Sequence, residues 1–196
     1  MGADQVTTLS DCDYPFSFDL DFLTGDVSRS TERVQRRLSD MQSLFYNKQA
    51  VAQSLSAGNP LIYEFFNTKF ITSTSDMAVA ITRIFPGRIG DEYFMSKGHQ
   101  HQRDDQPEMY ICVQGTGYLL LDTMQGEFRA ESWQPGTITH IPPFWAHRAV
   151  NTGADILVYI GVYHAAAGHI YTRVESQGFA RVAVERDGKP CLVPHP

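Results

Sequence analysis

From position 60 onward, glycine and proline turn signals divide the chain into short runs rich in aromatic and β-branched residues. Runs of this composition between turn signals are typical of β-strands. We predict strands over residues 61–72, 77–85, 92–95, 108–114, 118–122, 137–142, 156–163, 181–185 and 190–193. The last two form a hairpin around Asp187-Gly188. Many short strands joined by tight turns predict an all-β fold, either a sandwich or a jelly-roll β-barrel.

The residues before this region predict a short helix. Asn47 can cap a helix over residues 47–57. Val51 and Leu55 lie four residues apart on one face of it, and Gly58 ends it. We expect this helix to pack against the barrel.

Two other N-terminal segments have weaker patterns. Residues 33–45 place apolar side chains at helical spacing, yet an extended conformation of residues 36–41 fits as well, so both interpretations stay open. Phe16 and Phe18 alternate with polar neighbours, which predicts a strand that covers one end of the barrel.

The chain has 196 residues, of which 42% are hydrophobic, enough to bury one substantial core. We predict a single domain, in which residues 1–60 form an extension that packs on a barrel core and C-terminal hairpin of residues 61–196.

The net charge of −6 and the pI near 5.6 argue against a nucleic-acid partner, which needs a basic surface. No apolar run is long enough to span a membrane. The cysteines Cys12, Cys112 and Cys191 are widely separated, so we expect reduced thiols and a cytoplasmic location.

Four side chains in the middle of the chain predict a metal site. His99 and His101 lie two residues apart, so on a strand their imidazoles point to the same face. Glu108 and His147 follow at separations that suit neighbouring strands. Three imidazoles and one carboxylate suit a divalent transition ion such as Fe²⁺, Mn²⁺, Zn²⁺ or Ni²⁺, and leave coordination positions open. We therefore predict one such ion per subunit, held inside the barrel.

The spacing of these ligands and of the residues around them resembles the two motifs of the cupin superfamily. The first motif matches His99, His101, Glu108 and Gly115, and the second matches Gly136, Pro142, His147 and Asn151. Two features depart from the cupin pattern, because the gap between His101 and Glu108 is longer than usual and Phe144 replaces a glycine. The resemblance implies a cupin jelly-roll β-barrel, here with a short N-terminal helix and extra N- and C-terminal strands.

Further positions are similar to one branch of that superfamily, the cupin-type glucose-6-phosphate isomerases. The matching positions are 36–41, 63, 82, 86–87, 92, 96–99, 101, 108, 110, 135–137, 143, 145–148, 151–153, 167–169 and 171. This resemblance covers most of the chain and implies an enzyme that interconverts glucose 6-phosphate and fructose 6-phosphate, with Fe²⁺ as the favoured ion. It also implies a homodimer, in which N-terminal strands or residues 156–163 pair across subunits.

The resemblance implies catalytic roles for residues near the metal ligands. Glu108 is the candidate base that moves a proton between C1 and C2 of the open-chain sugar, although it is also a ligand. A metal-assisted hydride shift needs no such base and remains an alternative. Tyr110 shares the strand face of Glu108, and His169 with Tyr171 could assist ring opening or orient the sugar hydroxyls.

The phosphate-binding residues also follow from the resemblance, since the chain has no phosphate-binding P-loop motif. They are Tyr63, Thr82, Ser96, the backbone of Gly98, and Tyr163. Lys97 or Arg88 could add positive charge. Taken alone, the same residues could be ordinary strand aromatics, strand hydroxyls and solvated cations. Ser96 stands where threonine is usual and keeps the hydroxyl, whereas His164 and Ile170 depart from the family near the mouth of the site.

Two other functions fit the same ligands. One is a different metal-dependent cupin enzyme, either another sugar-phosphate isomerase or epimerase or an Fe(II) dioxygenase. A dioxygenase needs an apolar pocket, and the many hydroxyls disfavour it. The other is a non-catalytic sugar-binding cupin, which is expected to have lost one or more ligands, whereas all four are present here.

Overall fold

The structure, a computed structural model, describes residues 15–30, 32–68 and 75–196. Its largest sheet has six antiparallel strands in the order β1-β2-β3-β11-β6-β9. These strands are β1 (Glu32–Arg37), β2 (Leu61–Asn67), β3 (Met77–Ile84), β11 (Leu157–His164), β6 (Glu108–Gln114) and β9 (Ile138–Ile141). The sheet therefore places the N-terminal extension beside strands from the middle and end of the chain.

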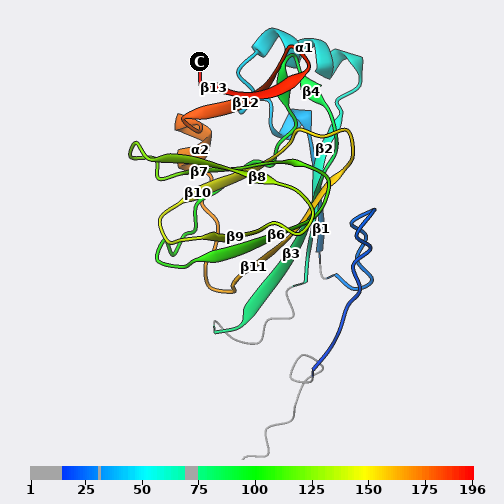
Figure 1. The fold of residues 1–196 in the computed structure, drawn as a ribbon, viewed down its shortest axis with the longest axis vertical. Coiled ribbons are helices and arrows are strands. Elements are labelled where there is room, and N and C mark those ends of the chain that lie inside the picture. The colour runs from blue at the N-terminus through cyan, green and yellow to red at the C-terminus, as the bar shows by residue number, and fades with distance from the viewer. Residues whose placement is uncertain (1–14, 31, 69–74) are drawn as a thin grey trace, which may run out of the picture.

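A second sheet lies across the core from the first (Figure 1). It has the order β10-β7-β8, with β10 (Ala146–Asn151), β7 (Gly117–Asp122) and β8 (Phe128–Trp133). Every residue of β10 is buried, and the inward side chains of both sheets meet in one apolar cluster that includes Leu119, Trp133 and Tyr159. The two layers form a jelly-roll β-barrel, as expected.

A third sheet lies at the end of the barrel where the C-terminus is found (Figure 1). Its order is β13-β12-β5-β4, with β13 (Lys189–Pro194), β12 (Arg181–Arg186), β5 (Glu92–Tyr93) and β4 (Arg88–Ile89). The helices are α1 (Lys48–Ala57), α2 (Thr172–Gln177) and the 3₁₀ helix η1 (Leu38–Asp40). Leu38 and Phe45 of the N-terminal extension belong to the same apolar cluster as the barrel strands, so the extension packs on the barrel.

Alternation along β11 separates an inner from an outer face of the large sheet. Tyr159 and Tyr163 point inward and line a pocket. Ile160 and Val162 point outward and are only partly buried. Because β11 pairs with β3 on one side and β6 on the other, its backbone is fully used within the subunit. Residues 156–163 therefore have no free edge for backbone pairing with a second subunit, and a subunit contact through the outer face of β11 stays a prediction.

The N-terminal predictions met different outcomes. The helix at 48–57 is confirmed, and the Asn47 side chain caps it by accepting from the Ala50 N–H at 3.0 Å. Neither interpretation of residues 33–45 is correct throughout: the extended conformation predicted for residues 36–41 holds only for Arg36 and Arg37 at the end of β1, and Leu38–Asp40 form η1. Arg33 on β1 reaches outward to Glu64 of β2 at 2.8 Å, an interaction that holds the strand in place. The apolar residues that follow lie in η1 and its flanking turns.

Several other expectations need correction. Phe16 and Phe18 lie outside any strand, in a segment whose backbone pairing is a single bridge between Leu20 and Val27. The strand over 92–95 is reduced to β5, followed by isolated bridges. Strand β2 ends at Asn67, while positions 69–72 of that prediction lie outside the described residues. Strands β4 and β8 and helix α2 were not predicted, because they are short or carry little apolar alternation.

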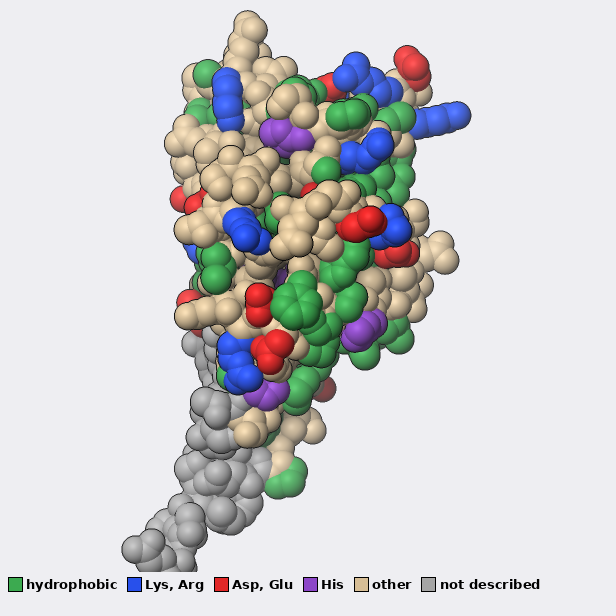
Figure 2. Space-filling view, turned by 90° about the vertical axis from the view of Figure 1, so that its left-hand side faces the viewer, with side chains coloured by type: hydrophobic (Ala, Val, Ile, Leu, Met, Phe, Trp, Pro, Cys, Tyr) green, Lys and Arg blue, Asp and Glu red, His purple; other side chains and the backbone are tan. Residues whose placement is uncertain are grey.

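The surface drawn in Figure 2 mixes charges of both signs. Lysine and arginine side chains are scattered among acidic ones on this face, and apolar side chains gather near its middle. No basic patch is visible on this face. Among the described residues, none of the helices is both long and apolar enough to cross a membrane.

Candidate metal centre and active site

Four ligand-type side chains meet at one point inside the barrel. They are His99, His101, Glu108 and His147, whose ligand atoms all lie within 4.8 Å of one another. From Oε2 of Glu108, Nε2 of His147 is 2.9 Å away and Nε2 of His101 is 3.1 Å away. Nε2 of His99 lies 3.1 Å from Nε2 of His147 and 3.9 Å from the same carboxylate oxygen. The structure thus brings all four predicted metal ligands together.

Two strands and one extended segment supply these side chains. Glu108 begins β6, and His147 lies in β10. His99 is not in a continuous strand, but its backbone pairs with His147 through two hydrogen bonds of 3.1 and 3.0 Å. The next bridge joins Gln100 to Ile170, so the segment stays extended. The two-residue spacing therefore aims both imidazoles of the segment at one point, although the local structure is not a regular strand.

Backbone carbonyls set the orientation of two imidazoles. Nδ1 of His101 lies 2.8 Å from the carbonyl oxygen of Gln106, and Nδ1 of His147 lies 3.2 Å from that of Trp145. A carbonyl can only accept, so each Nδ1 carries the hydrogen and each Nε2 presents a lone pair to the centre. These lone pairs face a carboxylate oxygen of Glu108 at 2.9 and 3.1 Å. Electron-pair donors at such distances repel one another unless a cation lies between them, either a proton that makes a hydrogen bond or a metal ion.

The spacing of the donors fits a metal ion. Ligands about 2.0–2.2 Å from one ion and at right angles to each other are separated by about 3 Å, close to the three shortest separations in the cluster. Three imidazole nitrogens and one carboxylate oxygen suit a divalent transition ion. His99 and Glu108 also line the adjoining pocket, so the cluster opens toward it.

The electrostatics of the cluster favour metal-binding protonation states for Glu108 and His99, while the carboxylate of Glu108 favours a proton on His101 until a metal ion replaces it. Burial alone would raise the pKa of Glu108, but hydrogen bonds from His101 and His147 hold it below its ordinary value. Burial, together with the neighbouring histidines, lowers the pKa of His99 well below its ordinary value. Burial would also lower the pKa of His101, yet its hydrogen bond to Glu108 raises it. The carboxylate is therefore ionised and His99 is neutral, as metal binding requires.

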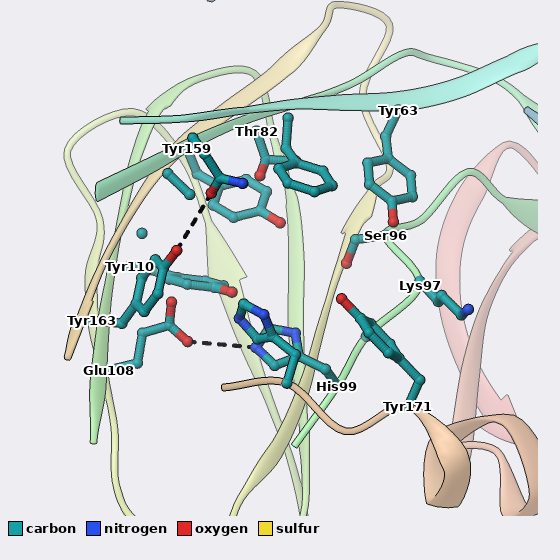
Figure 3. A pocket seen from close by; sticks show the side chains of 16 residues that line it. Tyr63, Thr82, Ser96, Lys97, His99, Glu108, Tyr110, Tyr159, Tyr163 and Tyr171 are labelled. Carbon is teal, nitrogen blue, oxygen red and sulfur yellow. Dashed lines mark hydrogen bonds and ion pairs between the residues drawn. The ribbon is translucent and has the colours of Figure 1, made fainter. Parts of the chain in front are cut away.

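A pocket adjoins the cluster, and all of the predicted substrate-binding residues line it (Figure 3). They are Tyr63, Thr82, Ser96, Lys97, Gly98, Tyr163 and Tyr171. Tyr110 and His169, which were predicted to be catalytic, line it too. Arg88, the alternative cation, is not among the lining residues and forms an ion pair with Glu185 in the third sheet.

The pocket has two chemically different ends, with His99 between them (Figure 3). At one end lie Glu108, Tyr110 and Tyr163. At the other lie Tyr63, Ser96, Lys97 and Tyr171. The first end presents the carboxylate beside the metal-type ligands, whereas the second presents hydroxyl and N–H donors.

Histidine 169 joins the cluster through aromatic contacts. Its ring centroid lies 4.2 Å from that of His99, edge to face, and 5.7 Å from that of Tyr163. Tyr171, two residues later, has its ring centroid 6.2 Å from that of His99. His169 and Tyr171 therefore both face the pocket, as their spacing predicted.

Sequence reasoning missed two polar residues of the pocket. Asn67, at the end of β2, accepts a hydrogen bond of 3.4 Å from the hydroxyl of Tyr163. Tyr159 lies in the most apolar run of the sequence, where it is indistinguishable from a core residue. Burial raises the pKa of its hydroxyl, and the neighbouring hydroxyls of Thr82 and Ser96 act in the opposite direction. The only sequence signal for Tyr159 is its two-residue and four-residue spacing from Gly161 and Tyr163 on one strand face.

Gly161 is required where the carboxylate approaches β11. A Cβ at this position would lie 2.9 Å from Cε1 of Tyr110 and 3.1 Å from Oε1 of Glu108. Such contacts are too short, so any side chain here would displace the carboxylate or the tyrosine ring. The missing side chain of Gly161 thus makes room for the metal-facing carboxylate.

Lys97 lines the pocket but its ammonium group turns to helix α2. Its Nζ lies 2.5 Å from Oε1 of Glu175 and 4.7 Å from the ring centroid of Tyr171.

Arg148, which follows ligand His147, points away from the cluster as expected for a strand neighbour. It is fully buried and donates to the backbone carbonyl of Lys97.

Comparison with known proteins identifies close relatives. A protein-family model described as glucose-6-phosphate isomerase (GPI) matches residues 35–193. The chain is 38% identical over 182 residues to the glucose-6-phosphate isomerase of Thermococcus litoralis, covering 93% of this chain and 95% of that protein. It is 35% identical over 182 residues to the glucose-6-phosphate isomerase of Pyrococcus abyssi, covering 93% and 96%.

Similarity to solved structures is weaker. Oxalate decarboxylase from Bacillus subtilis at pH 4.6 is 20% identical over 56% of this chain, with a TM-score of 0.45. The formate complex of the Lactobacillus farciminis enzyme is 21% identical over 56% of this chain, with a TM-score of 0.47. This chain spans 27% and 31% of those two chains. Their likeness bears on neither activity nor substrate.

Proposed function

Because this chain belongs to the glucose-6-phosphate isomerase family, we propose that it is a metal-dependent isomerase that interconverts glucose 6-phosphate and fructose 6-phosphate. One observation carries the proposal. A cluster of three imidazoles and one carboxylate opens into a pocket whose far end is lined by hydroxyl and N–H donors. A sugar phosphate needs both ends, one for the reacting carbons and one for the phosphate.

The phosphate belongs at the donor end of the pocket. Tyr63, Ser96 and the backbone of Gly98 supply uncharged donors there, with Thr82 beside them. Neutral hydroxyl and N–H groups are adequate donors to phosphate oxygens. Tyr163 lies at the other end, beside the carboxylate, so we assign it to the sugar hydroxyls rather than to the phosphate.

The metal belongs between His99, His101, Glu108 and His147, with Fe²⁺ as the favoured ion. When bound, a divalent ion would act as a Lewis acid that polarises the sugar carbonyl and stabilises the negative charge of an enediolate. Elemental analysis of protein purified without added metal would identify it. Absence of a stoichiometric transition metal would argue against this assignment.

Glu108 is positioned to act as the base. In the forward direction its carboxylate takes the proton from C2 of the open-chain aldose and returns it to C1, while the hydroxyl proton of O2 passes to O1. The low pKa of Glu108 keeps it in the base form. Tyr110, two residues along the same strand face, and His169 lie close enough to the pocket to orient hydroxyls or relay the second proton.

A direct hydride shift between C2 and C1 is the alternative route. Turnover in D₂O separates the two routes, because a proton carried by a carboxylate exchanges with solvent whereas a hydride does not. Deuterium at C1 or C2 of the product supports Glu108 as the base. Its complete absence favours the hydride shift.

The activity itself is tested by coupling fructose 6-phosphate turnover to detection of glucose 6-phosphate, with and without a chelator. Activity that disappears with chelator and returns with added metal is the expected result. Metal-dependent turnover of a different sugar phosphate would favour a related isomerase or epimerase. Binding without turnover would favour a sugar-binding cupin.

The apolar outer face of the large sheet supports the homodimer. Met109 of β6 and Ile138 of β9 point outward and are 41% and 62% exposed, and the half-exposed Val162 of β11 lies beside Met109. Strand β1 also leaves one edge of this sheet unpaired within the described residues. Light scattering on the protein and on the Met109→Glu variant tests the proposal, since a dimeric wild type and a more dissociated variant are expected.

We further propose that the chain is one domain, because the N-terminal extension and the barrel share one apolar core. We also propose a cytoplasmic role in glycolysis or gluconeogenesis, which the phosphorylated substrate supports.

A further inference from the structure

The phosphate end of the pocket has little uncompensated positive charge among its lining residues. A sugar phosphate carries a charge of about −1.5 to −2 near neutral pH. Lys97 is the one lysine or arginine among the pocket-lining residues that the structure describes. Its ammonium group lies 2.5 Å from the carboxylate of Glu175, so that carboxylate offsets its charge. A second cation close to this end would favour binding of the dianion.

Arg36 occupies such a position. It lies on β1 directly opposite Tyr63 of β2, and cross-strand partners share one face of a sheet. Tyr63 lines the pocket, so the half-buried Arg36 side chain is directed to the same side. The positive charge of Arg36 acts on both Tyr63 and Tyr171, which line the same end of the pocket.

Neighbouring arginines of the same sheet are used differently. Arg33 and Arg83 reach the carboxylate of Glu64 on the outer face, at 2.8 and 2.5 Å. Among the described residues no ion pair is formed by Arg36, and its charge acts on the two pocket tyrosines, Tyr63 and Tyr171. Its charge is therefore available to a ligand.

The contacts of Tyr63 extend this charge into the pocket. The charge of Arg36 and the backbone N–H of Lys97 both favour negative charge on the Tyr63 oxygen. The Tyr63 hydroxyl lies at the same end of the pocket as Ser96 and Lys97, where it can donate to a ligand (Figure 3). Burial raises the pKa of Tyr63 to about 12, so the hydroxyl hydrogen is retained at neutral pH.

We propose that Arg36 is a specificity-determining residue that recognises the charge of the substrate phosphate, directly and through the Tyr63 hydroxyl. This role deepens the proposed function and rests on it. The strand β1 of the N-terminal extension thereby contributes to substrate selection as well as to the fold. A sugar without phosphate gains nothing from this arginine.

The test compares Arg36→Gln with Arg37→Gln. Arg37 is the adjacent residue of β1, is exposed, and donates to the backbone carbonyl of Asn59, so it serves as the matched control. Losing a hydrogen bond to a charged group corresponds to about tenfold to hundredfold in binding. We expect Arg36→Gln to raise the KM for fructose 6-phosphate by that factor with kcat changed less than about threefold, and Arg37→Gln to match the wild type.

Inorganic phosphate provides a readout that does not depend on turnover. Its dissociation constant, measured by calorimetry, should rise by a similar factor in Arg36→Gln and be partly restored in Arg36→Lys. Metal content should equal that of the wild type. Unchanged KM and phosphate binding in Arg36→Gln, wild-type protein that binds no phosphate, or a defect accompanied by metal loss would each overturn the proposal. Phosphate binding that depends on Arg36 in a protein without isomerase activity would instead refute the proposed function alone.

Discussion

The guanidinium of Arg148 donates two hydrogen bonds to the backbone carbonyl of Lys97, at 3.3 Å from Nε and 2.8 Å from Nη2. Its charged plane also lies 4.5 Å from the ring centroid of Phe179. Lys97 immediately precedes Gly98, whose backbone faces the pocket, while Arg148 immediately follows the ligand His147. One buried arginine therefore links the phosphate end of the pocket to the strand that carries a metal ligand.

Replacing Arg148 with methionine should destabilise the protein. The carbonyl of Lys97 would lose both donors, and the buried carboxylate of Glu92 would lose the cation that interacts with it. Removing one partner of a buried charged network lowers the free energy of unfolding by about 3 kcal/mol. Urea unfolding of Arg148→Met measures this. Arg129→Met, at an exposed position of β8, is the control and should change stability little; equal losses in the two variants would contradict the assignment.

Glu92 predicts an unusual dependence of stability on pH. Burial raises its pKa to about 7, although the Tyr46 backbone N–H and the charge of Arg148 act in the opposite direction. Asp91 raises the pKa further, and Lys48 lowers it. One carboxylate oxygen, Oε1, is buried without a hydrogen-bond partner, which explains why the protonated form is favoured in the folded protein.

The sign of the effect follows from the higher affinity of the folded state for the proton. The stabilising contribution of protonated Glu92 is fully present below pH 4.5, the ordinary pKa of the carboxyl, and is lost as the pH rises through about 7. The loss amounts to about 3 kcal/mol. Between pH 5 and 8 the unfolding free energy of the wild type should therefore fall relative to that of Glu92→Gln. Parallel pH profiles of the unfolding free energy for the wild type and Glu92→Gln would show that burial does not raise the pKa of this carboxyl. Glu131 is exposed, so the profile of the control variant Glu131→Gln should follow that of the wild type.

Metal removal should abolish activity and lower thermal stability. An ion bound only by the folded state stabilises it by about 4 kcal/mol at a thousandfold excess over its dissociation constant. His147→Ala should give the same loss as a chelator, with less than stoichiometric metal by elemental analysis. His140→Ala is the matched control, because His140 is exposed on the outer side of β9. If a chelator left the melting temperature and the activity of the wild type unchanged, the assignment of a metal ion to this site would be wrong.

The histidine pair of the metal cluster was predictable from short-range geometry, whereas His147 joins it through tertiary pairing with His99. His99 and His101 need only an extended backbone to face the same way, and Glu108 starts the next strand. The longer gap between His101 and Glu108 contains the carbonyl of Gln106, which orients the His101 ring. The departure from the usual spacing thus leaves the ligand geometry intact.

Other features depend on tertiary contacts that sequence periodicity does not contain. The sequence predicts that Tyr159 is a core residue. Only the sheet pairing shows that its side chain, like that of Tyr163, lines the pocket. Strand β8 pairs along the whole of β7 but has exposed polar residues such as Arg129, so its apolar alternation is weak. Strand β1 is extended because β2 pairs with it, although its Val34 begins a series of apolar residues at helical spacing that continues with Leu38 and Met41.

Gly98 and Gly188 offer a matched test of crowding at the phosphate end. Both have a φ of +74°, so alanine at either position meets the same backbone strain, about 1–2 kcal/mol. A Cβ on Gly188 would have no neighbour within 4 Å, whereas a Cβ on Gly98 would lie 3.0 Å from Phe179 and 3.1 Å from Arg148. Gly98→Ala should therefore destabilise the protein by about 1–3 kcal/mol more than Gly188→Ala. Gly98→Ala should also raise the KM for fructose 6-phosphate. Equal stability and equal KM in the two variants would show that Phe179 and Arg148 move to accommodate the added methyl group.

Phe144 explains why the cupin pattern has glycine at its position. Its φ is +73°, in the left-handed region that side chains rarely adopt, while its N–H donates to the carbonyl of Asp104 at 2.8 Å. Phe144→Gly relieves a strain of about 1–2 kcal/mol, offset by about 0.5–1 kcal/mol of added flexibility in the unfolded chain. Phe22, equally exposed at 58% and without a positive φ, gains no such relief. In urea unfolding we therefore expect Phe22→Gly to lose about 1–2 kcal/mol more than Phe144→Gly. A larger loss at Phe144 would mean that its contacts at the barrel mouth outweigh the backbone strain.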